Sequence, residues 1–258
     1  MDHRRLGRTG FKPSVIGFGA FKIGRNVGIK YPSGYDLPDD AEAIRIVHGM
    51  LETGINYIDT APAYGLSEKR IGKALQQVDA SDVFVSTKVG ETFVDGESSF
   101  EYSEDAVRNS VENSCRLLGR DPLDIVFVHS NGDDLHIQNR SDCVRTLQAL
   151  RDAGRIRAIG FSGKTPEGAE AALSWADAIM VTYHEQDRSH EDVIEKAAQH
   201  GLGVVVKKGL ASGHLEPHEA IRFVLSNPNV TSMVIGGLNP QHMAENVRIA
   251  EALRVSAT

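Results

Sequence analysis

Short runs rich in Val and Ile alternate with helical segments along the whole chain, and no other feature constrains the fold as much. Most of these runs are bounded by Gly, Asp or Ser. A strand buried on both faces of a parallel sheet has this near-continuous apolar pattern. We therefore expect eight parallel strands, at Val15–Phe21, Asn56–Ala61, Val83–Val89, Asp124–His129, Ile156–Ser162, Ala178–His184, Gly203–Lys208 and Val230–Ile235.

The segments between the runs have the spacing and the ends of amphipathic helices. Ile44, Val47 and Leu51 share one helical face, and Gly54 follows as a C-terminal cap. Ser103 precedes two acidic residues, which is typical of a helix N-terminus. Eight strands that are each followed by a helix predict an α/β fold of the (β/α)8 TIM-barrel type, with an open doubly wound sheet as the alternative.

The barrel prediction places one domain over residues 1–258. Before the first strand, residues 5–10 are typical of a turn, and we expect a short N-terminal β-hairpin that closes the barrel floor. Three long connections, Lys22–Pro38, Gly90–Tyr102 and Ser130–Ser141, follow strands. They should therefore emerge on one face and form the walls of a substrate pocket.

Charge and composition exclude several classes of partner. The formal net charge is −7 and no Lys/Arg cluster stands out, which argues against nucleic-acid binding and membrane-surface binding. No stretch approaches ~18 consecutive apolar residues, and no signal peptide is visible at the N-terminus. The two cysteines fit no metal or redox spacing. We expect a cytoplasmic protein.

Polar residues gather where three neighbouring strands are expected to end. Asp59, Lys88 and His129 end the second, third and fourth strands, and Tyr64 follows Asp59 in the next loop. The C-terminal ends of barrel strands form the active site in this architecture. A buried ion pair stabilises a fold weakly, so the four groups together favour a catalytic role over a structural one.

The four residue types suit proton transfer to an oxygen. A free tyrosine has a pKa near ~10, and a neighbouring ammonium favours the phenolate and lowers that value. We expect Lys88 to lower the pKa of Tyr64, while Asp59 keeps Lys88 charged and in place. His129 would orient a substrate oxygen beside the Tyr64 hydroxyl, making Tyr64 a general acid for a carbonyl oxygen.

Two glycine-containing loops follow the last two expected strands, where barrels often bind a phosphate. The first is Lys207–Gly213, in which Lys208 and Ser212 can donate hydrogen bonds, and the second is Gly236–Pro240. The usual dinucleotide fingerprint is absent, because Lys22 stands where a third glycine would be needed. A dinucleotide would therefore have to lie across the barrel mouth.

With these motifs in place, the chain resembles the aldo-keto reductase superfamily over nearly its whole length. The most specific stretch is Gly54–Gly65, which carries Asp59 and Tyr64 and is followed by Ser67-Glu68. The strands that end in Lys88 and His129 and the fifth run, Gly154–Ser162, also match. The resemblance implies hydride transfer between NADP(H) and an aldehyde, ketone or sugar, with the roles given above for Asp59, Tyr64, Lys88 and His129.

The resemblance also implies a cofactor site and a substrate wall. Phe21 and Phe93 are expected substrate contacts. Lys207 replaces an aromatic residue that often stacks on the nicotinamide, and Leu238 and His242 stand where many relatives carry a cation. A neutral histidine holds a 2′-phosphate less well than a guanidinium, so NAD(H) stays open beside NADP(H). The expected cofactor contacts are Gly19, Ala20, Ser162, Lys207, Lys208, Leu210, Ser212, Gly237, Leu238, His242, Glu245 and Asn246.

Two other functions compete with a reductase. A metal-dependent hydrolase could use Asp59, His129 and His184, although the first strand supplies no ligand. A regulatory or sensor protein could keep the cofactor and turn over little, because the residues expected around the nicotinamide are altered. The expected partner is a small carbonyl compound, with the chain as a monomer or small homo-oligomer.

Overall fold

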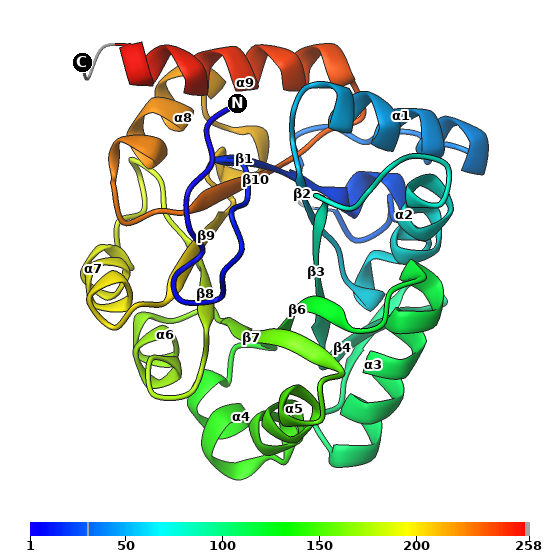
Figure 1. The fold of residues 1–258 in the computed structure, drawn as a ribbon, viewed down its shortest axis with the longest axis vertical. Helices are drawn as coiled ribbons and strands as arrows, with labels where there is room; N and C mark the ends of the chain where they lie inside the picture. The colour runs from blue at the N-terminus through cyan, green and yellow to red at the C-terminus, as the bar shows by residue number, and fades with distance from the viewer. Residues whose placement is uncertain (30, 256–258) are drawn as a thin grey trace.

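Eight parallel strands close into a barrel in this computed structural model, which describes residues 1–29 and 31–255. Around the barrel the strand order is β1-β10-β9-β8-β7-β6-β3-β2 (Figure 1). This closure confirms the (β/α)8 prediction and rules out the open sheet. The strands are β1 Ile16–Gly19, β2 Tyr57–Asp59, β3 Phe84–Val89, β6 Leu123–His129, β7 Ile156–Ser162, β8 Ala178–Thr182, β9 Gly203–Lys207 and β10 Ser232–Gly236.

Helices form a ring outside the strands (Figure 1). α3 illustrates why they form: Val107, Val111 and Leu118 lie on its buried face, and the Ser103 side chain accepts a hydrogen bond from the Ala106 amide at 3.4 Å. The helices are α1 Asp40–Glu52, α2 Ser67–Leu75, α3 Glu104–Leu118, α4 Asp134–Arg140, α5 Cys143–Asp152, α6 Pro166–Ala172, α7 Glu191–Gln199, α8 Pro217–Ser226 and α9 Pro240–Val255.

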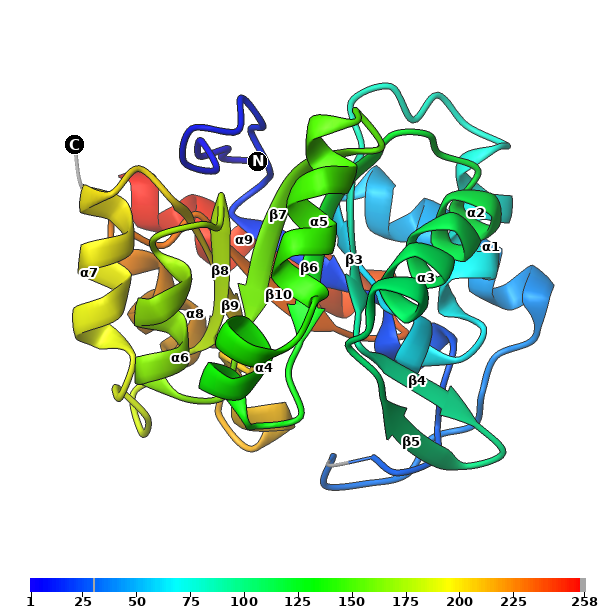
Figure 2. The ribbon, with the colours of Figure 1, turned by 90° about the horizontal axis from the view of Figure 1, so that it is seen from below.

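The N-terminal segment closes one end of the barrel. Leu6 and Phe11 are buried in the same apolar cluster as residues inside the barrel, and a Cβ on Gly203 would lie only 2.3 Å from a Leu6 methyl carbon. Figure 2 shows this segment at the end of the barrel opposite β4 and β5. Two regular strands are not confirmed here, because one isolated antiparallel bridge joins His3 and Ser14. The segment is a hairpin-like loop.

β1 and β2 are shorter than their sequence patterns predict. The last pair of residues joining them is Gly19 and Asp59. Beyond it the chain turns into two short 3-10 helices, η1 (Ala20–Ile23) and η2 (Pro62–Tyr64). Strand propensity at Ala61 or Phe21 does not extend the strands, because a strand needs a paired neighbour. As a result, Tyr64 lies in a tight turn soon after Asp59.

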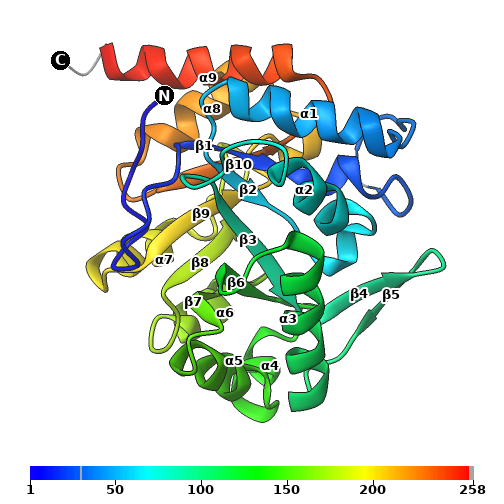
Figure 3. The ribbon, with the colours of Figure 1, turned by 45° about the vertical axis from the view of Figure 1, so that its right-hand side comes forward.

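Two of the long connections contain regular structure. β4 (Glu91–Val94) and β5 (Glu97–Phe100) form an antiparallel hairpin inside the second connection, and α4 lies inside the third. The hairpin projects from the barrel beside α3 (Figure 3). In the part of the chain that the structure describes, no helix is long and apolar enough to cross a membrane.

Candidate active site

The four residues expected to be catalytic line one cavity of about 800 Å³ at the C-terminal ends of the barrel strands. Asp59 ends β2, Lys88 lies near the end of β3, His129 ends β6 and Tyr64 ends η2. We call this space the mouth cavity. Its remaining walls come from residues within 19–29, from Tyr31, from the loops after β6 to β9 and from the end of β10.

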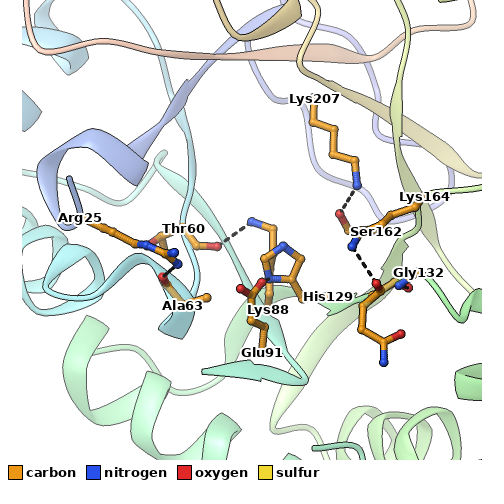
Figure 4. Close-up of polar contacts among 12 residues, drawn as sticks. Arg25, Thr60, Ala63, Lys88, Glu91, His129, Gly132, Ser162, Lys164 and Lys207 are labelled. Carbon is orange, nitrogen blue, oxygen red and sulfur yellow. Dashed lines mark hydrogen bonds and ion pairs between the residues drawn. The ribbon is translucent and has the colours of Figure 1, made fainter. Parts of the chain in front are cut away.

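Lys88 and Asp59 form a closed, buried ion pair. The Lys88 Nζ lies 2.7 and 2.8 Å from the two carboxylate oxygens and donates a third hydrogen bond to the Thr60 carbonyl at 2.8 Å (Figure 4). The Ser86 hydroxyl also donates to Asp59, at 2.7 Å. Burial lowers the pKa of Lys88, and Asp59 opposes that shift. All three ammonium protons therefore have acceptors, and the pair is fixed in place.

Tyr64 lies against this pair, but its pKa moves in the direction opposite to the one expected. The Lys88 Nζ is 4.8 Å from the centre of the Tyr64 ring, and Phe21 packs edge-on at 5.1 Å. Burial raises the pKa of Tyr64 well above its usual value, and the Asp59 carboxylate raises it further. Because both Asp59 oxygens contact Lys88, the ammonium charge is compensated and does not acidify the phenol. Tyr64 therefore keeps its proton at neutral pH.

His129 has a carboxylate partner that the sequence patterns did not identify. The ring Nδ1 lies 2.9 Å from a carboxylate oxygen of Glu91, which lies on β4. That oxygen is out of line with the ring N–H, and the two groups form an ion pair only when the imidazole is protonated. Burial lowers the pKa of His129, and Glu91 opposes the shift. The strand-like run Glu91–Val94 within the long connection was the one sequence signal for this partner.

Lys207 lies on β9, in the wall of the same cavity. Its Nζ donates hydrogen bonds to the Ser162 hydroxyl at 2.9 Å and to the Gly163 carbonyl at 2.7 Å. Both acceptors are neutral. Burial, with the nearby charges of Lys208 and Lys88, lowers the pKa of Lys207 to about 7.

The loop after β9 has the geometry of a ligand-holding segment. Lys208, Ala211 and Ser212 are non-glycine residues with positive φ angles of 57°, 44° and 60°, and all three line the mouth cavity. Such strained residues cluster at ligand clamps, and turns of this kind can present backbone N–H groups to an anion. Two lysines beside this loop add positive charge. This donor set fits the phosphates of a dinucleotide.

The mouth cavity brings together half of the expected cofactor contacts. Gly19, Ser162, Lys207, Lys208, Leu210 and Ser212 line it. Ala20 is buried beside it, whereas Gly237 and Leu238 lie just beyond Gly236, which lines its edge. The contacts expected on α9 lie farther along the chain: His242 and Glu245 are exposed and Asn246 is buried. Their contact with a cofactor stays a prediction.

Of the two expected substrate contacts, Phe21 lines the cavity and Phe93 lies behind it. The Arg25 guanidinium carbon is 3.5 Å from the centre of the Phe93 ring, and Arg25 itself lines the cavity. Arg25 also donates to the Ala63 carbonyl at 3.0 Å (Figure 4). Phe93 thus supports a wall that Arg25 and Tyr31 complete, two residues that the sequence patterns did not single out.

Asp59, His129 and His184 all line the cavity without forming a metal-ligand cluster. Within residues 1–29 and 31–255, no group of three or more His, Cys, Asp or Glu side chains could hold a metal ion. The ligand set that a hydrolase would need is therefore not assembled by the described residues.

Comparison with known proteins gives consistent matches. The aldo/keto reductase family matches residues 15–220. A solved structure described as an aldo-keto reductase from Pseudomonas aeruginosa is 42% identical, with a TM-score of 0.89, over 98% of this chain and 96% of that one.

Two curated relatives are similar over almost the same extent. The L-galactose dehydrogenase of Arabidopsis thaliana is 29% identical over 96% of this chain and 87% of its own length. The D-threo-aldose 1-dehydrogenase of a Pseudomonas species is 28% identical over 96% of this chain and 92% of its own. The family match spans most of the barrel and includes all four residues that converge on the mouth cavity, so the chain belongs to the aldo/keto reductase family and is an oxidoreductase of that type.

Proposed function

We propose that the chain interconverts a carbonyl compound and its alcohol with a nicotinamide dinucleotide, and that Tyr64 transfers the proton. One observation carries the proposal. A protonated phenol, a fixed lysine–carboxylate pair and an imidazole share one cavity with a loop suited to phosphates.

Tyr64 is suited to be a proton donor because its pKa is raised. A donor must hold its proton until the carbonyl oxygen becomes an alkoxide, which is far more basic than a phenolate. The raised pKa therefore favours reduction at neutral pH. Oxidation of an alcohol needs the phenolate, so the reverse reaction should be favoured as the pH rises.

Lys88, Asp59 and His129 prepare the position of the substrate oxygen. The ion pair holds Lys88 beside the Tyr64 ring, and the Glu91 carboxylate lies at Nδ1 of His129. Nε2 must carry a proton to donate a hydrogen bond to a carbonyl oxygen, because an unprotonated ring nitrogen only accepts. Together these contacts fix the groups before the substrate arrives, which is how pre-organised sites lower a barrier.

The cofactor residues are proposed from the same cavity. Ser162 and Lys207 would adjoin the nicotinamide, and Lys208 and Ser212 would adjoin the phosphates. When bound, the dihydronicotinamide supplies the hydride. We propose NADP(H) as the cofactor. NAD(H) is the alternative, because the exposed His242 stands where the family resemblance leads us to expect an arginine or lysine for the 2′-phosphate.

The substrate class proposed is an aldehyde, ketone or sugar, with sugars tested first. The two curated relatives are by name sugar dehydrogenases. Polar side chains around the cavity, among them Arg25, Lys22 and Asp187, could hydrogen-bond to sugar hydroxyls.

A paired binding and turnover experiment tests the proposal. Fluorescence titration with NADPH and with NADH gives the two affinities, and steady-state assays with a panel of aldehydes and aldoses give turnover in both directions. We expect binding and turnover with activated aldehydes at least. Tight binding without turnover of any substrate would instead identify a regulatory protein, and absence of binding would remove the reductase function.

A further inference from the structure

The buried Lys88 and the half-buried Lys207 lie on opposite walls of the mouth cavity, and they differ in their partners. In the strand order, β9 lies four strands from β3 in either direction around the barrel, so Lys207 and Lys88 come from opposite walls. Figure 4 shows Lys207 pointing toward Ser162 from the side away from Lys88. Both amines line the mouth cavity, so a nicotinamide ring bound there would have a lysine on each side.

The charges on the two walls are not equivalent. Lys88 is compensated by both oxygens of Asp59. Lys207 donates only to a hydroxyl and a carbonyl, and no carboxylate of the described residues lies within ion-pair distance of its amine. Protonated Lys207 therefore presents an uncompensated positive charge to the cavity.

We infer that Lys207 makes the site distinguish between the two oxidation states of the cofactor, holding the reduced form more tightly whenever its amine is protonated. The inference rests on the proposed function and deepens it. An oxidised nicotinamide ring carries a positive charge and a reduced ring carries none, while the phosphates are common to both. A nearby ammonium therefore repels only the oxidised form.

The preference should depend on pH because Lys207 titrates near neutrality. Its pKa is lowered to about 7, mainly by burial. By reciprocity, a ligand that is disfavoured by the ammonium must lower the pKa of Lys207 further when it binds. Below pH 7 the site prefers the reduced cofactor, and above pH 8 the neutral amine removes the preference. The site would therefore release oxidised cofactor after reduction at low pH and accept it for oxidation at high pH.

Other titratable groups border the same space, and the experiment must separate them from Lys207. His129 is also titratable, and burial lowers its pKa from the ordinary histidine value. The charged or titratable groups around Lys207 on neighbouring elements are Asp59, Tyr64, Lys88, Glu91, His129, Asp134, Lys164, His184, Asp187, His190 and Lys208.

The test measures equilibrium binding, without turnover. NADPH affinity is measured by its fluorescence and NADP⁺ affinity by displacement of NADPH, at pH 6.0 and pH 8.5. For the unmodified protein we expect the ratio of the NADP⁺ and NADPH dissociation constants to be about fivefold larger at pH 6.0 than at pH 8.5. NADH and NAD⁺ replace this pair if they bind more tightly.

Three variants assign the effect to Lys207. Lys207→Met should make the ratio independent of pH, and Lys207→Arg should keep it high at both pH values, because a guanidinium stays charged. Lys208→Met is the matched control: it should weaken both forms and keep the ratio dependent on pH, with the change moved to higher pH because the Lys208 charge lowers the pKa of Lys207. Circular dichroism confirms that each variant is folded.

Two results would overturn the inference while leaving the proposed function intact. One is a ratio that does not change with pH in the unmodified protein. The other is a pH dependence that survives in Lys207→Met and therefore belongs to His129 or another group. If neither oxidation state binds at all, both the inference and the proposed function fail.

Discussion

The two lysine-bearing walls of the mouth cavity show how the same side chain acquires different properties from its acceptors. The Lys88 amine on β3 donates to both oxygens of a carboxylate and to a carbonyl. The Lys207 amine on β9 donates to a hydroxyl and a carbonyl. Burial lowers the pKa of both amines. The Asp59 carboxylate opposes that shift at Lys88. Lys88 is therefore held in a fixed ion pair, whereas Lys207 changes its charge near pH 7.

Removing the cation from each wall in turn should have unequal effects on stability. Lys88→Met leaves Asp59 buried without its partner, and breaking a buried pair in this way costs about 3–5 kcal/mol. Lys207→Met leaves behind only a hydroxyl and a carbonyl, so its effect on the free energy of unfolding should be smaller, about 1 kcal/mol. Urea unfolding measures both. The double variant Asp59→Asn/Lys88→Met should recover part of the loss, and equal effects of the two single variants would remove the distinction between the walls.

The pH dependence of stability should also differ between the walls. The pKa of Lys207 is about 7 in the folded protein and near its ordinary value of 10.5 when unfolded. The unfolded state therefore binds more protons between these values, and this residue makes stability rise with pH from about 7 upward. Lys207→Met lacks this gain, so its unfolding free energy should fall relative to that of the unmodified protein as pH increases from 6 to 9. A constant difference would contradict the low pKa.

His129 lies on β6, between the two walls, and its pKa should respond to the charges of both lysines. Lys88 and Lys207 both lower its pKa, and Glu91 raises it. Glu91→Gln should therefore lower the pKa of His129, and Lys207→Met should raise it, each by less than about one unit. NMR titration of the imidazole resonances measures these shifts. Glu97→Gln, on the exposed partner strand β5, is the matched control and should leave the titration unchanged.

The sequence predicted the parts of this site that follow from strand ends. Asp59 and His129 end buried strands and Lys88 lies near the end of another, and parallel strands in a closed barrel bring such residues to one rim. The barrel itself followed from the repeated apolar runs. These features depend on local sequence pattern and on the rule that the C-terminal ends of barrel strands meet at one rim, so the sequence alone predicts them.

The parts that the sequence did not predict depend on contacts between distant segments. The raised pKa of Tyr64 follows from burial and from the Asp59 carboxylate, which compensates the charge of Lys88. The spacing of these residues in the sequence does not show either effect. The pairing of Glu91 with His129 needs the β4–β5 hairpin to fold back on β6. The early ends of β1 and β2 depend on where their neighbours stop pairing.

The most direct test of the account is the rate of carbonyl reduction by Tyr64→Phe under conditions where cofactor binding is measured in parallel. Phenylalanine keeps the ring that packs beside Lys88 and removes only the hydroxyl. We predict that reduction falls by about 10²–10⁴-fold, in the range expected for loss of a general acid, while NADPH affinity stays within twofold. Reduction near the unmodified rate, with the variant folded and cofactor bound, would show that another group delivers the proton.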